Sequence, residues 1–201
     1  MDQTHPYNGS LTAEQFLFYE ISIAAKYYVS GLKIDEAIER IKKDNLFQYP
    51  TERQVSRLAR ACYKRLDALG NDQLVHELAS APNEIAKQIN LYAVMRYNRL
   101  VWEFMIQVIG EKYRNQDMNF SRKDMNAFFS RLQAQDDSVA AWSDATITKI
   151  KSVLVRMLIE TGYLDGLKDT TLNPVFLCEE LERGIEANND YDALSAFNYF
   201  R

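Results

Sequence analysis

The sequence predicts an all-α, compact multi-helix protein. Apolar side chains recur with the spacing of one helix face, about 3.6 residues, along almost the whole chain. Seven glycines and four prolines in 201 residues leave little room for the turns of an all-β protein. Several of the expected helices also follow a Ser, Thr or Asn that can act as an N-cap.

The first long helix is expected from Thr12 to Ser30. A capping box of Thr12 and Gln15 would open it, and Gly31 would close it. Its aromatic side chains, Phe16 and Tyr27 among them, are expected in the core. A stacking platform for bases is the alternative interpretation, although aromatic residues at helical spacing usually pack.

The next two helices are arranged like a helix-turn-helix. Residues 34–43 form a short amphipathic helix with acidic residues in its first turn and lysines in its last, as the helix dipole favours. Pro50 keeps Tyr49 out of the α region and so ends the connector, after which Thr51 caps a longer helix, with Gln54 completing a capping box. The connector exceeds the usual three or four residues, so this is a variant of the motif.

The longer helix carries a stripe of cations. At about 100° per residue, one face holds four basic residues: Arg53, Arg57, Arg60 and Lys64. The opposite face is apolar: Val55, Leu58, Ala59, Cys62 and Leu66. In a chain with a net charge of -4, the four cations form a local basic patch, and such patches bind phosphate backbones. A solvated helix whose arginines only face water is the alternative.

The remaining helices are expected at five places. They are 71–79, with Asn71 as cap; 84–113, with a break near 96–99; 120–132, capped by Ser121; 144–161, capped by Ser143; and a final pair opened by Asn173 and Pro174. The chain is thus expected to divide into an N-terminal, helix-turn-helix-like DNA-binding part, 1–70, and a C-terminal helical part, 71–201, with an acidic tail.

A second, sparser cationic stripe falls on the helix expected at 144–161. Lys149 and Arg156 share one face of it, and a wing-like strand could follow at 162–164, although a plain surface helix is the simpler interpretation. Residues 165–201 hold eight acidic and three basic residues, so this tail would repel phosphate. Its acidic surface could instead meet a basic partner protein.

Catalytic and metal-binding motifs are absent from the sequence. No GxxxxGK[ST] loop, GxGxxG turn, HExxH helix or GxSxG elbow is present. His5 and His76 have no partners at ligand spacing, and Cys62 and Cys178 are expected to be buried free thiols. We therefore expect no enzyme, and no cofactor, metal ion or small-molecule substrate.

The chain is also expected to be a cytoplasmic protein of one large or two small domains. No apolar run reaches the roughly 18 to 20 residues of a membrane span. The polar start, MDQTHPYNGS, lacks the regions of a signal peptide.

Three runs of the sequence resemble the BrxA family, the small all-helical component of bacteriophage exclusion (BREX) defence systems. They are DNLFQYPTERQVSRLARACYKRLDAL (44–69), INLYAVMRYNRLVWEFMIQVIGEKYR (89–114) and AAWSDATITKIKSVLVRMLIETGYL (140–164). The resemblance covers about 17–164 and rests on pattern and order, since none of the runs is a catalytic motif. It implies a two-part helical protein, a fold akin to an RNA-binding antitermination factor in one part, and binding to double-stranded DNA.

The charge pattern and the resemblance together predict a non-enzymatic DNA-binding component of a defence system. Phosphate contacts by the basic stripe would bind duplex DNA with little sequence preference, because nothing in the sequence points to base readout. Other BREX proteins are the expected protein partners. Two alternatives remain open: an adaptor that docks other proteins of a defence complex, and an RNA-binding protein resembling antitermination factors.

Overall fold

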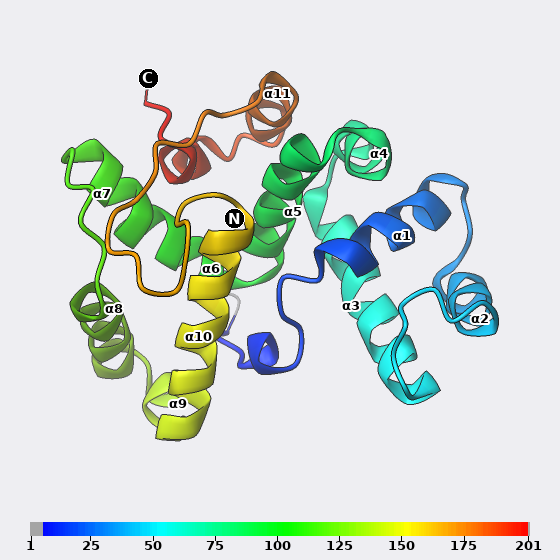
Figure 1. Cartoon of the computed structure of the whole chain (residues 1–201), viewed down its shortest axis with the longest axis horizontal. Helices are drawn as coiled ribbons and strands as arrows, with labels where there is room; N and C mark the ends of the chain where they lie inside the picture. Colours follow the sequence, from blue (N-terminus) through cyan, green and yellow to red (C-terminus); the bar gives the residue numbers. More distant parts are fainter. Residues whose placement is uncertain (1–5, 201) are drawn as a thin grey trace. The chain divides into compact units, whose positions relative to one another are not determined.

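The computed structural model of the chain describes residues 6–200, and in this range it is all-α (Figure 1). Eleven α-helices and three 3-10 or π-helical segments follow one another without a β-strand between residues 6 and 200. One isolated antiparallel bridge joins Asn119 to Thr171. The predicted fold class is therefore confirmed. No helix that the structure describes has both the length and the hydropathy needed to cross a bilayer.

Contacts divide the chain into two units, each built from separate stretches of sequence. The first unit comprises the N-terminal stretch up to Gln15, Asn98–Leu177 and the stretch from Asn189 onward. The second unit comprises Phe16–Tyr97 and Cys178–Asn188. The predicted division into an N-terminal, helix-turn-helix-like DNA-binding part, 1–70, and a C-terminal helical part, 71–201, stays a prediction.

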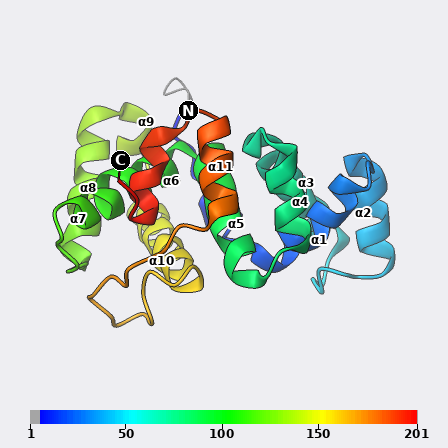
Figure 2. The same ribbon diagram turned by 90° about the horizontal axis from the view of Figure 1, so that it is seen from above.

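The second unit is a bundle of six helices. They are α1 (Phe18–Val29), α2 (Ile34–Lys43), α3 (Glu52–Leu69), α4 (Asp72–Ser80), α5 (Asn83–Tyr97) and α11 (Glu179–Ala187). The long α3 packs against α1, α2 and α5, and α11 lies against α4 and α5 (Figures 1 and 2). Helix α3 is therefore held from several sides, which fixes the direction of its exposed face.

Local signals set the ends of α2 and the starts of α3 and α4 as the sequence predicts. The bounds of α2 match the predicted ones, and Thr51 caps α3 by accepting a hydrogen bond from the backbone N–H of Gln54. Asn71 caps α4 in the same way through the N–H of Leu74. The predicted apolar face of α3 is buried, with both Val55 and Leu58 only 2% exposed.

The predicted helix from Thr12 to Ser30 is wrong at its start, because α1 begins only at Phe18. Thr12 lies in the short segment η1 (Ser10–Thr12), where its hydroxyl donates to the Gly9 carbonyl instead of capping a helix. Leu17 then adopts a left-handed conformation, with φ of 56°. The carbonyl of Phe16 accepts hydrogen bonds from Arg65 and Asn90, which holds it outside the helix.

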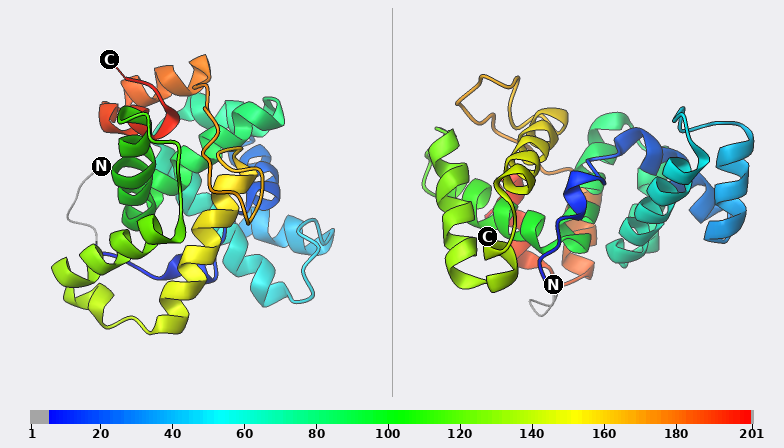
Figure 3. Two further views of the ribbon diagram at one scale, coloured as in Figure 1. Left: turned by 60° about the vertical axis from the view of Figure 1, so that its left-hand side comes forward. Right: turned by 90° about the horizontal axis from the view of Figure 1, so that it is seen from below.

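The first unit contains the remaining elements. Besides η1, they are α6 (Arg99–Phe104), the π-helical η2 (Met105–Gly110), α7 (Glu111–Arg114), α8 (Arg122–Gln135), α9 (Asp137–Ala140), α10 (Asp144–Glu160) and η3 (Tyr191–Phe197). The segments α6, η2 and α7 follow one another as one irregular helix, against which η3 packs (Figure 3). Gly110 permits this close approach, because a Cβ there would lie 2.6 Å from the Ser195 hydroxyl.

Several predictions for this unit are confirmed. Asn98 interrupts the helix expected at 84–113 and caps α6, inside the predicted break. Ser121 and Asp124 form a complete capping box on α8, and Ser143 caps α10.

Two other predictions for the C-terminal part are wrong. Asn173 and Pro174 do not open a helix, because α11 begins at Glu179. The side chain of Asn173 instead donates to Asp165, at 2.7 Å, and to the Gly162 carbonyl. The wing-like strand considered after Gly162 is also absent from the described residues, and Tyr163 there is fully buried.

Candidate nucleic-acid interface

The cationic stripe of α3 is exposed along its whole length. Arg53, Arg57, Arg60 and Lys64 all lie on the solvent side of the helix, opposite the buried face formed by Val55, Leu58, Ala59, Cys62 and Leu66. Their spacing, four, three and four residues, keeps successive side chains one helical turn apart. The structure thus brings together all four residues that the sequence predicts for the primary site.

Only one of the four cations is paired with an acid of the described chain. Arg60 Nη2 lies 2.8 Å from Asp35 Oδ1, and both side chains are largely exposed. Arg53, Arg57 and Lys64 form no ion pair with any of residues 6–200. Three charges are therefore available to an external anion, and the fourth is held by a pair that water already screens.

Acidic residues near the ends of the stripe are engaged elsewhere. At the start of α3, Glu52 lies 3.9 Å from the Lys42 ammonium group. Toward its end, Asp67 accepts a hydrogen bond from the Tyr28 hydroxyl at 2.8 Å. Burial and this bond to Asp67 raise the pKa of Tyr28 to about 12, so the hydroxyl stays a donor at neutral pH. Asp35, paired with Arg60, is therefore the only acid of the described residues that forms an ion pair with the stripe.

A groove of about 570 Å³ lies beside the C-terminal half of the stripe, at Arg60 and Lys64. Arg60, Lys64 and Lys33 line it together with Tyr28 and Tyr63, the side chains of Asp35 and Asp67, and the turn at 31–34. The groove therefore places three cations beside two carboxylates, and the hydroxyls of Tyr28 and Tyr63 already donate to Asp67 and to the Leu32 carbonyl.

The second predicted stripe is also exposed. Lys149, Ser152 and Arg156 lie on the solvent side of α10, and neither cation forms an ion pair within the described part of the chain. Lys151 is not available in the same way, because it donates to Asn126 and lies over the Phe129 ring. This stripe belongs to the first unit and the α3 stripe to the second.

One basic residue of α3 has a different role. Arg65 is 1% exposed, and its Nη1 donates to the Phe16 carbonyl at 2.9 Å. Asn90 donates to the same oxygen at 3.0 Å. Arg65 follows Leu58 by seven residues and so falls on the apolar face, which is the sequence signal that separates it from the stripe.

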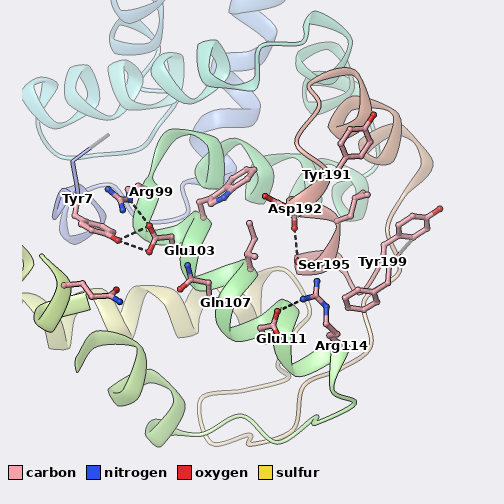
Figure 4. A pocket seen from close by; sticks show the side chains of 15 residues that line it. Tyr7, Arg99, Glu103, Gln107, Glu111, Arg114, Tyr191, Asp192, Ser195 and Tyr199 are labelled. Atoms are coloured by element: carbon pink, nitrogen blue, oxygen red, sulfur yellow. Dashed lines mark hydrogen bonds and ion pairs between the residues drawn. The ribbon is translucent and has the colours of Figure 1, made fainter. Parts of the chain in front are cut away.

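A polar pocket in the first unit was not anticipated from the sequence. It has a volume of about 1220 Å³ and lies between α6, η2 and α7 on one side and η3 on the other (Figure 4). Five aromatic side chains line it: Tyr7, Trp102, Tyr191, Tyr199 and Phe200. The spacing of Arg99 with Glu103 and of Glu111 with Arg114 could have indicated part of it, but Tyr7, Gln135 and the residues of 191–200 come from distant stretches of the chain.

Arg99 contacts both an aromatic ring and a carboxylate in this pocket. Its guanidinium lies 4.2 Å from the centre of the Tyr7 ring, and its Nε is 2.7 Å from Glu103. Burial alone would lower the pKa of Arg99, but the hydrogen bond to Glu103 and the neighbouring Tyr7 raise it. Burial and the hydrogen bond to Glu103 raise the pKa of Tyr7 to about 12. At neutral pH the Tyr7 hydroxyl is therefore protonated and can donate to Glu103, and Arg99 is positively charged.

Nothing in the described chain forms a metal centre. No group of three or more His, Cys, Asp or Glu side chains converges among residues 6–200. Neither Cys62, which is buried, nor Cys178, which is half-buried, forms a disulfide within the described residues. Of the two histidines, His76 is exposed, and His5 lies outside the described residues.

Comparison with known proteins gives consistent matches. The profile of the BrxA family matches residues 5–189. A protein of Bacillus cereus named BREX protein BrxA is 34% identical over 81% of this chain and 80% of its own. Proteins of the same name from Paramagnetospirillum magneticum and Escherichia coli are 22% and 25% identical over 85% and 78% of this chain, covering 85% and 73% of their own.

A solved structure shares the fold. The crystal structure of an uncharacterized protein from Magnetospirillum magneticum aligns with a TM-score of 0.81, over 95% of this chain and 97% of that chain, at 21% identity.

Proposed function

Because the chain belongs to the BrxA family of BREX defence proteins, we propose that it is a non-enzymatic component of that system that binds double-stranded DNA in the cytoplasm. The α3 stripe, Arg53, Arg57, Arg60 and Lys64, is its phosphate-contacting surface. Lys149 and Arg156 on α10 add a weaker, secondary contact. Other BREX proteins are its protein partners.

One observation carries this proposal. Four exposed cations follow one face of a helix whose opposite face is buried, and three of them have no acidic partner among residues 6–200. The unpaired cations attract an extended polyanion to that face. The rest of the chain is acidic, since the net charge is -4, and repels the polyanion. Arginine also donates to phosphate oxygens in a fixed fork geometry, which suits the DNA backbone.

Backbone contacts of this kind bind DNA with little sequence preference. Long, flexible side chains on an exposed helix reach phosphates without a fixed relation to the base edges. The order of α2, connector and α3 resembles a helix-turn-helix, but the connector of eight residues, 44–51, is longer than in that motif.

Charge reversal tests the surface. Replacing Arg57 and Arg60 together by Glu should abolish most binding of a labelled DNA duplex, measured by fluorescence anisotropy, because attraction becomes repulsion in the middle of the stripe. Circular dichroism and the melting temperature should stay close to wild type, since the buried face is untouched.

The matched comparison is the same reversal of Lys149 and Arg156, which changes the net charge equally and should weaken binding only modestly. A dominant effect of this second pair would move the DNA surface to α10. Tighter binding to single-stranded or duplex RNA of the same sequence would replace the DNA assignment by an RNA-binding one.

A second function, as a protein adaptor, is favoured by two exposed apolar side chains. Phe176 is 82% exposed and Leu167 71% exposed, both between α10 and α11. Replacing Phe176 by Ser should then reduce co-purification with other BREX proteins and leave DNA binding unchanged. Unchanged co-purification would remove the support for this function.

A further inference from the structure

The first unit also contains a groove with an apolar floor, which we call the α8–α10 groove. It has a volume of about 760 Å³ and lies between α8, α10 and the loop that follows α10. Five apolar side chains line it: Phe120, Met125, Val155, Leu164 and Leu167. Three of them are at most 4% exposed and Val155 is half-buried, but Leu167 is 71% exposed. A large apolar side chain therefore lies in solvent at the edge of an apolar groove.

The rim of the α8–α10 groove is mainly cationic. Three cations line it, one from each wall: Arg122 on α8, Lys151 on α10 and Lys168 in the loop. Asp169 is the only acid among the described residues that line the groove. None of these four side chains forms an ion pair within residues 6–200. The rim thus carries more positive than negative charge, in a chain whose net charge is -4.

Lys151 holds its charge between two neutral partners. Its ammonium group donates to Asn126 Oδ1 at 2.8 Å and lies 5.2 Å from the centre of the Phe129 ring, so it bridges α10 and α8. The side chain is half-buried. An ammonium group has three donors, and the bond to Asn126 uses one of them. A carboxylate that enters the groove would therefore meet a cation with donors to spare and no acid of its own.

We infer that the α8–α10 groove binds an acidic amphipathic helix of a partner protein. Apolar side chains of that helix would pack on the floor and against Leu167, and carboxylates beside them would pair with Lys151 and Arg122. This inference deepens the adaptor function proposed above, on which it rests, by naming the docking surface and the chemistry of the partner. It does not depend on the DNA surface of α3, which belongs to the other unit.

The floor and the rim together favour this partner over duplex DNA. A phosphate backbone would pair with the rim cations but would leave the apolar floor and Leu167 in contact with water. A helix with apolar side chains at i, i+3 and i+4 and acidic ones between them matches both. More than half of the lining side chains are exposed, so the groove is open to solvent and suits a segment of a longer chain better than an enclosed small molecule.

Binding of labelled peptides tests the inference. The probe is a fluorescein-labelled peptide of three Leu-Glu-Glu-Leu units, whose leucines follow one helix face. Its anisotropy should rise in a saturable way as the full chain is added, with a Kd of roughly 10 to 100 µM. The same peptide with Gln or Lys in place of Glu should bind at least about tenfold more weakly, because it lacks the carboxylates. A peptide of strictly alternating Leu and Glu has no apolar helix face and should bind more weakly as well.

Two variants of the protein locate the peptide in the groove. Lys151→Gln should weaken the acidic peptide at least about fivefold, and Leu167→Ser at least about threefold. Lys123→Gln is the matched control for charge, since it removes an exposed cation of α8 that does not line the groove. Leu167 is exposed, so its replacement should leave the melting temperature unchanged even if Lys151→Gln lowers it.

Three results would each overturn the inference: no saturable binding of the acidic peptide, equal binding of the Gln peptide, or equal weakening by Lys151→Gln and Lys123→Gln. A duplex DNA that loses as much affinity in Lys151→Gln as the acidic peptide does would also overturn it, because the groove would then be a phosphate site.

The peptide titration also separates this inference from the adaptor function. If Phe176→Ser lowers co-purification with other BREX proteins but the acidic peptide does not bind, the adaptor function stands and the groove is not its docking surface. If the acidic peptide binds through Lys151 and Leu167 but Phe176→Ser co-purifies like the wild type, the groove binds acidic helices and the support from Phe176 is lost.

Discussion

Arg60 Nη2 lies 2.8 Å from Asp35 Oδ1, so one cation of the α3 stripe is paired with a carboxylate of α2. The side chains are 53% and 77% exposed, and an ion pair in such a position adds little stability. Its effect is on the surface itself: Asp35 places a negative charge beside the cations and competes with any phosphate for Arg60.

Asp35→Asn should therefore strengthen DNA binding, by about two- to fivefold, which corresponds to the usual free energy of an exposed pair. Anisotropy titrations at one fixed salt concentration measure the change. Glu36→Gln is the control, because it removes an exposed charge from the same turn of α2 without releasing a stripe cation. If both variants gain equally, net charge alone decides the affinity, and the contact with Arg60 has no special role.

Salt should weaken binding steeply. If four side chains each neutralise one phosphate, log K should fall against log salt with a slope of about -3 to -4. Arg57→Ala should make the slope shallower by about 1, because one phosphate contact is lost. A slope near zero for the wild type would show that the stripe does not contact the DNA backbone.

Replacing a side chain by Ala should change the stability of the protein far more on the buried face of α3 than on its exposed face. Leu58 is 2% exposed on a helix that packs against α1, α2 and α5, so Leu58→Ala should cost roughly 2 to 5 kcal/mol through lost burial and a cavity. Arg57→Ala on the exposed face should stay within about 0.5 kcal/mol of the wild type. Urea unfolding of both variants measures this, and similar losses would mean that the arginine face is packed as well.

Acid should destabilise the first unit partly through one network around Lys112. Its ammonium group lies 3.0 Å from both Asp117 and Asp124. Burial alone would raise the pKa of Asp124, but hydrogen bonds from Lys112 and Ser121 outweigh it and lower the pKa, and the bond from Lys112 also lowers the pKa of Asp117. Carboxyl groups with depressed pKa values stabilise the fold above about pH 4 and lose that contribution as the pH falls through their folded values.

The melting temperature of Asp124→Asn should thus fall less steeply below about pH 4 than that of the wild type. At neutral pH the variant should melt lower, because it also loses the capping box of α8. Lys112→Met should likewise make the melting temperature fall less steeply below about pH 4, since both carboxylates lose their shared donor. If the melting temperature of both variants falls as steeply at acid pH as that of the wild type, the network does not contribute to the loss of stability in acid.

Part of the candidate interface could be predicted from residue spacing within one helix, and part could not. The face of α3 that carries Arg53, Arg57, Arg60 and Lys64 could be predicted because helical spacing alone separates it from the buried residues, and Arg65 falls on the buried side by the same rule. That Asp35 reaches Arg60 could not be predicted, because their contact depends on how α2 packs against α3.

The sequence by itself determined the all-α class, many helix starts and the exposed face of α3. These features depend on groups within about one turn of each other, such as the Thr51 hydroxyl with the Gln54 backbone N–H, or Ser121 with Asp124. Only the tertiary structure decided that α1 starts at Phe18, since distant Arg65 and Asn90 bind the Phe16 carbonyl, and that Tyr7 and Tyr191 join α6 around one pocket. Contacts between residues far apart in the chain leave no local spacing to recognise, and they form only when the helices pack.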